Sequence, residues 1–245
     1  MGSPHLVDPT AKGRPSRTHR PAILHVEPGE LVSPGSFNWP SFRQSWEDLP
    51  RDTWMADGGT YRRRRYAAFQ VQGRECLRLP HQPHYQRRTY NSLNGGVQRW
   101  FEPLTDKVAG SLLLKSLITD TAAIISRFDR GPEQSWKVEA HQFRIEAAPG
   151  GLGLPTPEGM HQDGREWVLL LYIGGSSFVG GQTRVETSGG VLLLDHRLSR
   201  AGEGLLLDDR RVRHETSAIQ GNVSADPEYR DTLVLTFESR PAGSG

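Results

Sequence analysis

Three residues of metal-ligating type form the most informative pattern in this sequence. His161 and Asp163 stand two positions apart, and His214 follows much later in the chain. Two imidazoles and one carboxylate can hold iron(II) on one face of its octahedron, which leaves the opposite face open for a co-substrate and dioxygen. The sequence therefore predicts a metal centre formed by His161, Asp163 and His214.

Strand geometry explains how the first two of these residues can share one ion. Side chains alternate along a strand, so His161 and Asp163 at i and i+2 point to the same side. The tripeptide alone is a weak signal, because His25 and Glu27 have the same spacing. A Pro-Gly turn directly follows that second pair, so no strand leads away from it, and we do not expect it to bind metal.

The expected last strand carries a candidate anion site. Arg230 and Thr232 share one of its faces, while alternating apolar residues occupy the other. A buried arginine requires an anionic partner, and its planar fork binds a carboxylate through two hydrogen bonds, to which a neighbouring hydroxyl can add a third. The competing interpretation is a salt bridge at the rim with Asp231 or Glu228.

Four further side chains are candidates for contact with a substrate. Gln142 and Arg144 lie on one face of an expected strand, and Arg165 and Trp167 continue the parity of the His-x-Asp pair unless the intervening glycine breaks it. An outward salt bridge competes for Arg144, and a place in the core competes for Trp167. His141 faces the other way, and we interpret it as a structural histidine.

Composition limits the class of protein. The chain has 245 residues, a net charge of +2, a pI near 8.8 and a single cysteine, Cys76. The lone cysteine, together with the absence of an apolar leader, favours a cytoplasmic location. The longest apolar run, residues 167–173, is too short for a membrane span, which needs about 20 residues. We expect residues 1–20 to be disordered and residues 21–240 to form a single domain.

The hydrophobic pattern predicts a helical first half followed by strands. Apolar residues at three- and four-residue spacing predict a helix over residues 103–128, and a shorter helix is expected over 41–49. Period-two patterns predict strands at 21–32, 61–71, 136–147, 166–173, 182–187, 190–194, 204–207, 212–219 and 232–238. This order is typical of a mainly β, cupin-like jelly roll, or double-stranded β-helix, with helices packed outside.

The motifs together resemble a known enzyme family. HQFR at 141–144, PEGMHQDG at 157–164, GGQT at 180–183, His214 and RDTLVLTF at 230–237 resemble the iron(II)/2-oxoglutarate dioxygenases that hydroxylate free amino acids, a family typified by bacterial L-isoleucine dioxygenase. The likeness covers roughly residues 50–240.

The resemblance implies a set of ligands and a reaction. Iron(II) is held by His161, Asp163 and His214, and 2-oxoglutarate is held by Arg230 together with Thr232. An unactivated C–H bond of a free L-amino acid or a close derivative is hydroxylated with dioxygen, and succinate and CO2 are released. We therefore expect a small-molecule substrate and neither a nucleic acid nor a membrane as partner.

Two other functions compete with this interpretation. Four consecutive arginines, residues 62–65, are compatible with a dioxygenase that acts on nucleic acid or protein, although strand alternation splits them between two faces. A cupin-like metal-binding protein without oxidative activity is the other alternative, because a fold does not fix an activity. Such a protein has no need of the carboxylate clamp at Arg230.

Overall fold

The computed structural model describes residues 20–32, 39–129, 134–222 and 226–240. Except for Arg20, the segment 1–20 that we expect to be disordered lies outside the described residues. No helix within the described ranges combines the length and the apolar character that a membrane span requires.

The described residues contain three helices. They are α1 (Trp39–Gln44), α2 (Asp106–Ala109) and α3 (Leu112–Ser126). The strands in the first half of the chain are β1 (Ile23–Val26), β2 (Arg62–Gln72), β3 (Glu75–Arg78), β4 (His84–Tyr85), β5 (Gln98–Arg99), β6 (Ser135–Ala147) and β7 (Leu152–Gly153). Those in the second half are β8 (Trp167–Gly175), β9 (Val179–Gly180), β10 (Thr183–Thr187), β11 (Leu192–His196), β12 (Gly204–Asp208), β13 (Val212–Thr216), β14 (Ile219–Gln220) and β15 (Glu228–Arg240).

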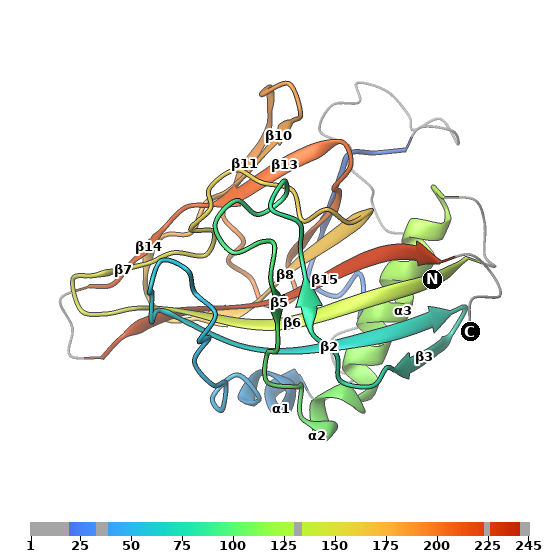
Figure 1. The fold of residues 1–245 in the computed structure, drawn as a ribbon, viewed down its shortest axis with the longest axis horizontal. Coiled ribbons are helices and arrows are strands. Elements are labelled where there is room, and N and C mark those ends of the chain that lie inside the picture. The colour runs from blue at the N-terminus through green and yellow to red at the C-terminus, as the bar shows by residue number, and fades with distance from the viewer. Residues whose placement is uncertain (1–19, 33–38, 130–133, 223–225, 241–245) are drawn as a thin grey trace.

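One large antiparallel sheet organises the molecule. Its strand order is β1-β12-β8-β15-β6-β2-β3. Two smaller sheets, β11-β10-β13 and β7-β14-β9, and the β4-β5 ribbon complete the fold. In Figure 1 the helices lie on one side of the large sheet, and β10, β11 and β13 lie on the other. The prediction of a mainly β jelly roll with flanking helices is confirmed.

The two faces of the large sheet have different chemistry. On β15, Leu233, Leu235 and Phe237 are fully buried against the helices and belong to the main core cluster. The alternate residues of the same strand, among them Arg230 and Thr232, line a cavity on the opposite face. Because strand side chains alternate, one strand supplies both the core and the cavity wall.

Several boundaries differ from those expected from the sequence. The helix predicted over 103–128 is divided into α2 and α3, because Thr105 and Ser111 each accept a hydrogen bond from a backbone N–H three residues on and so begin separate helices. The strand predicted over 212–219 is likewise divided. Its first part, β13, pairs with β10, whereas β14 crosses to β7 and β9. The last strand begins at Glu228, earlier than predicted.

Candidate metal centre and its cavity

The fold brings His161 and His214 next to each other. Their backbones form an isolated antiparallel bridge, in which the N–H of each residue donates to the carbonyl of the other over 3.0 and 2.8 Å. β13 supplies His214, and Asp163 follows His161 after one residue. Ligand atoms of the three side chains all lie within 4.8 Å of one another. The three residues predicted as metal ligands therefore converge on one point.

The spacing and orientation of these groups suit a metal ion. Nε2 of His161 lies 3.9 Å from Oδ1 of Asp163, and Nε2 of His214 lies 3.8 Å from Oδ2. These gaps are too long for hydrogen bonds, whereas an ion that makes bonds of about 2.0–2.2 Å fits between such atoms. Nδ1 of His161 donates to the carbonyl of Gly159 over 2.9 Å, which leaves the lone pair of Nε2 directed at the centre.

Asp209 fixes the turn that carries Asp163. Its Oδ1 accepts from the N–H of Asp163 over 3.0 Å, and its Oδ2 accepts from the N–H groups of Gly164 and Arg165 over 2.8 and 3.1 Å. Burial and the neighbouring Asp163 raise the pKa of Asp209 to about 7. The sequence pattern gave no reason to single out Asp209, which precedes β13 and acts through backbone groups.

The two histidines have opposite electrostatic surroundings. Burial lowers the pKa of His161, but Asp163 and Glu158 outweigh this effect and raise it overall. Burial, reinforced by His161, lowers the pKa of His214 well below its usual range. His214 is therefore neutral, as a metal ligand must be.

Arg230 is buried without a counter-ion. It is 4% exposed, its Nε has no hydrogen-bond partner, and no carboxylate within the described ranges lies at ion-pair distance. Burial lowers its pKa to about 10. The competing interpretation, a salt bridge at the rim, is not found in the described part of the chain. Asp231 faces away and pairs with Arg144 over 2.8 Å, and Glu228 accepts from the amide of Asn222 over 2.7 Å. A buried, unpaired guanidinium is suited to binding an anion.

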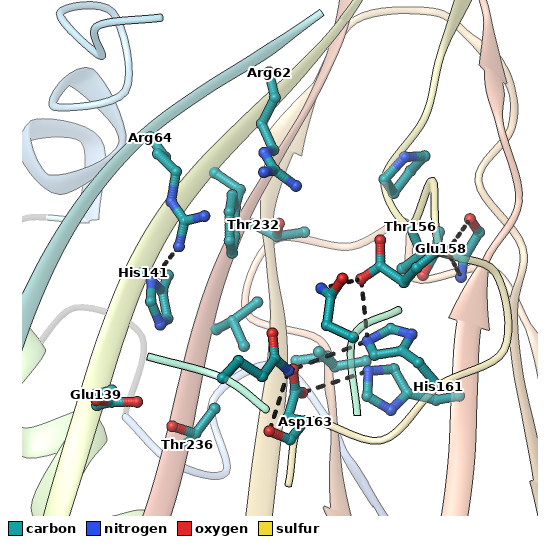
Figure 2. Close-up of a pocket in the computed structure, with 18 of the residues that line it drawn as sticks. Arg62, Arg64, Glu139, His141, Thr156, Glu158, His161, Asp163, Thr232 and Thr236 are labelled. Atoms are coloured by element: carbon teal, nitrogen blue, oxygen red, sulfur yellow. Dashed lines mark hydrogen bonds and ion pairs between the residues drawn. The ribbon is translucent and has the colours of Figure 1, made fainter. Parts of the chain in front are cut away.

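The metal centre and Arg230 open into one cavity of about 110 Å³. Figure 2 shows His161 and Asp163 on one side of it and Arg62, Arg64 and His141 on the other. The large sheet contributes one wall of the cavity through β2, β6 and β15, whereas the cover comes from the 84–99 segment. This segment supplies His84, Gln86, Asn91 and Arg99.

The structure corrects three of the four predicted substrate contacts. Arg165 lines the cavity and pairs with Glu139 over 2.8 Å. Gln142 instead donates to Ser45 over 2.8 Å on the helix side of the sheet, where Arg144 is also held, by Asp231 and Glu47. On β6 the residues that face the cavity are odd-numbered, so parity excludes Gln142 and Arg144.

Trp167 is the third corrected contact. It is fully buried in the core, and its Nε1 donates to Asp129 over 2.7 Å. Gly164 has a φ of +73°, which breaks the alternation after Asp163. His141, which we interpreted as structural, is one of the β6 residues that line the cavity.

The second His-x-carboxylate pair lies elsewhere. His25 is on β1 and contacts Glu27 over 3.2 Å and Glu203 over 3.1 Å. Glu203 is already held by the backbone N–H groups of Ser199 and Arg200. We assign this cluster to a network of ion pairs rather than to catalysis.

Comparisons with known proteins agree with this geometry. A curated relative, the 3(1)-hydroxy-L-isoleucine 4-dioxygenase of Pantoea ananatis (strain AJ13355), is 21% identical over 158 residues, which make up 64% of this chain and 64% of that protein. The chain thus matches less than two thirds of the length of that relative.

Solved structures extend the comparison to most of the chain. The crystal structure of a BsmA homologue from Methylobium petroleophilum PM1 has a TM-score of 0.78 and 34% identity, and the match covers 89% of this chain and 87% of that one. The structure of IDO from Bacillus thuringiensis has a TM-score of 0.68 and 17% identity over 90% and 91% of the two chains, which shows a shared fold. The family model described as 2OG-Fe dioxygenase matches residues 43–236, and the chain therefore belongs to this family.

Proposed function

We propose that this enzyme hydroxylates an unactivated C–H bond of a free L-amino acid or a close derivative, with 2-oxoglutarate and dioxygen as co-substrates and with release of succinate and CO2. The 2OG-Fe dioxygenase family uses iron(II), 2-oxoglutarate and dioxygen. The observation that carries the proposal is the small cavity in which groups of both charges, each with a buried polar atom that has no partner, lie near the predicted metal centre.

The cavity has features that suit a small zwitterion. Oε2 of Glu158 is buried without a partner, while its Oε1 lies 3.6 Å from Nε2 of His161. An unpaired buried carboxylate oxygen is an acceptor for an ammonium group. Buried guanidinium groups line the same cavity. The name of the curated relative, an amino acid dioxygenase, is consistent with such a substrate.

Each residue has a role in this reaction. His161, Asp163 and His214 would hold iron(II), and Arg230 with Thr232 would bind the distal carboxylate of 2-oxoglutarate. With iron(II) and 2-oxoglutarate bound, dioxygen would be the oxidant: one of its oxygen atoms would enter the C–H bond of the substrate, and the other would enter succinate as 2-oxoglutarate loses CO2. The protein orients the reactants and excludes water from the cavity. Asp209 keeps the carboxylate of Asp163 aimed at the metal by holding the turn on which it stands.

The arginine run does not favour a nucleic-acid substrate. Arg62 and Arg64 are buried and line the cavity. Arg63 pairs with Glu146, and Arg65 donates to the carbonyl of Pro103. These residues therefore form no continuous surface patch for phosphates.

We also propose that residues 21–240 form one dioxygenase domain that works in the cytoplasm. The family match covers most of this range. Cys76 is buried and free, and burial raises the pKa of its thiol to about 11. Such a thiol is unreactive, and a reducing compartment keeps iron in the ferrous state.

The proposed function is tested by incubating the protein with iron(II), ascorbate, 2-oxoglutarate and each of the free L-amino acids. We expect succinate together with a product one oxygen atom heavier than the amino acid that was supplied. Release of succinate only in the presence of an oligonucleotide or a polypeptide would contradict the choice of substrate. The same measurement on Asp163→Ala serves as the inactive control.

A further inference from the structure

The cavity contains a second cluster of two histidines and a carboxylate. Ligand atoms of His84, Glu139 and His141 lie within 4.8 Å of one another, and all three side chains are buried. This composition matches that of the predicted iron centre. The hydrogen bonds around the second cluster, however, leave it with N–H donors rather than with the free lone pairs that a metal ion requires.

Each histidine of this second cluster accepts a hydrogen bond from an arginine. Nη2 of Arg64 lies 2.7 Å from Nδ1 of His141, and Nη2 of Arg99 lies 3.1 Å from Nδ1 of His84. A guanidinium group only donates, so each Nδ1 must be the accepting, unprotonated nitrogen. Burial lowers the pKa of His84 to about 3 and that of His141 well below its usual range, so both rings are neutral. A neutral ring with a bare Nδ1 carries its proton on Nε2.

The remaining nitrogens are therefore donors rather than metal ligands. Glu139 offers no free carboxylate either, because Tyr66 donates to its Oε1 over 3.0 Å, Lys137 lies 3.3 Å from that oxygen, and Arg165 donates to Oε2 over 2.8 Å. Arginines surround the two imidazoles, which further disfavours a cation. The second cluster is thus suited to an anion.

The adjacent arginines carry more positive charge than their partners balance. Asp52 is the one carboxylate shared by Arg62, at 2.7 Å, and Arg64, at 3.5 Å. Within the described residues, Arg99 has no carboxylate at ion-pair distance, and the Nε atoms of Arg64 and Arg99 are buried without a partner. Burial lowers the pKa of Arg99 to about 10. Buried charge in excess of its counter-ions is stabilised when an anion binds.

The guanidinium of Arg64 is also fixed in place. Its central carbon lies 3.4 Å from the centroid of the Phe101 ring and 4.5 Å from that of Phe143. Stacking on aromatic rings keeps the fork in one plane, which reduces the entropy lost when it binds a planar ligand.

This group of arginines is separate from Arg230. On the cavity face, Ile145 of β6 pairs with Arg62 on one side and with Arg230 on the other. Phe143 likewise stands between Arg64 and Thr232. The two sites are therefore two strands apart, or roughly 10 Å at the backbone. With Arg230 engaged by 2-oxoglutarate, a second anion site remains for the other reactant.

We propose that Arg64 and Arg99, together with the Nε2–H groups of His84 and His141, form a second anion site that binds the carboxylate of the amino acid substrate. This assignment rests on the proposed function. The two guanidinium forks and the two imidazole donors supply the in-plane hydrogen bonds that a carboxylate accepts. Glu158, on the opposite side of the cavity near His161, is then available for the ammonium group.

The test is calorimetric titration of the holoenzyme under argon, loaded with iron(II) and 2-oxoglutarate, so that binding is measured without turnover. The probes are the free L-amino acids, the carboxamide of each one that binds, and inorganic phosphate. We expect at least one amino acid to bind, and its carboxamide to bind at least about tenfold more weakly, because a hydrogen bond to a charged group contributes about 1.5–3 kcal/mol.

Variants locate the site. Arg99→Gln should weaken binding of that amino acid about 10–100-fold while 2-oxoglutarate binds as in the wild type. Arg230→Gln should weaken binding of 2-oxoglutarate while the amino acid binds as in the wild type. Arg65→Gln is the matched control, because Arg65 lies on the same strand but faces away and donates to the carbonyls of Pro103 and Asp48. It should leave both affinities unchanged.

Three results would overturn the assignment: Arg99→Gln binds the amino acid as tightly as the wild type, the carboxamide binds as well as the acid, or phosphate binds more tightly than any amino acid. If no amino acid binds while 2-oxoglutarate is still converted slowly to succinate in air, the carboxylate site is wrong but the dioxygenase reaction stands. If the wild type produces no succinate although an amino acid binds in the predicted way, the proposed function fails and the carboxylate site stands. His84→Leu, which removes one donor of the site, provides a second variant should Arg99→Gln fail to fold.

Discussion

His161 and His214 are joined by reciprocal backbone hydrogen bonds, 3.0 and 2.8 Å long, although they are far apart in the sequence. Their rings lie 4.5 Å apart between centroids. Because the backbones are paired, the two imidazoles are held at a fixed separation before any ion arrives. Preorganisation of this kind lowers the entropy lost on binding.

Metal binding should depend on this pair and on Asp163. We expect His214→Ala and Asp163→Ala to lose stoichiometric binding of iron(II), measured by equilibrium dialysis under argon, because each substitution removes one of three protein ligands. His25→Ala is the control, since His25 belongs to the separate cluster with Glu203. Retention of one tightly bound iron per chain by either alanine variant would refute the predicted ligand set.

Asp209 should act as a positioning residue for the metal. Asp209→Ala removes the acceptor of three backbone N–H groups that shape the turn at Asp163, and we expect iron(II) affinity to fall about 10–100-fold. Asp209→Asn, which keeps one acceptor oxygen, should recover part of the affinity. The idea fails if both variants bind iron as the wild type does, and circular dichroism checks that each remains folded.

Arg230 should determine the affinity of the protein for 2-oxoglutarate. We expect Arg230→Gln to raise the dissociation constant for 2-oxoglutarate about 10–100-fold, and Thr232→Val to raise it by a smaller factor, because a hydrogen bond to a charged donor is about twice as strong as a neutral one. Calorimetry on the iron-loaded protein under argon measures both values. Equal affinities for 2-oxoglutarate in Arg230→Gln and the wild type would show that 2-oxoglutarate does not bind at Arg230.

Stability should fall in acid because of groups in the cavity. The pKa of His84 in the folded protein, about 3, is below the usual 6.5. Between these two pH values the unfolded chain therefore binds a proton at His84 and the folded protein does not. Stability from this group is complete above about pH 6.5 and is lost as the pH falls towards 3. Burial raises the pKa of Glu139, but Arg165, Lys137 and, once it is protonated in acid, His84 outweigh burial and lower the pKa to about 2, so this group loses its contribution as the pH falls below about 4.5.

Urea unfolding at pH 7 and pH 5 measures the first of these effects. We expect the loss of unfolding free energy between the two pH values to be about 2 kcal/mol smaller in His84→Gln than in the wild type, because one pKa unit corresponds to about 1.4 kcal/mol. The groups that face His84 are Tyr66, Glu139 and His141 on the sheet, Arg64 and Arg99 beside it, and Arg165. The exposed His81 provides the control, and His81→Gln should leave the pH dependence unchanged.

Local pattern singled out several residues that the fold brings together around one cavity. The spacing of His161 and Asp163 indicated a shared ion, and the alternation along the last strand placed Arg230 and Thr232 on the face opposite the apolar core. The same alternation divided the arginines of residues 62–65 into the cavity-facing Arg62 and Arg64 and the two outward residues. Periodicity is a property of neighbouring residues, so it can be recognised without knowledge of the fold.

By itself, the sequence determined the residue types of the candidate ligands, the mainly β class and which residues of a strand share a face. Only the tertiary structure decided which face meets the cavity: on β6 it is the face of His141, not that of Gln142, because sheet pairing turns the even-numbered side towards the helices. Tertiary contacts also placed Asp209 against the turn that carries Asp163, and they placed the 84–99 segment over the cavity. The physical reason is that alternation along a strand shows which residues share a face but not which face points into the cavity. Contacts with segments distant in the chain determine that orientation.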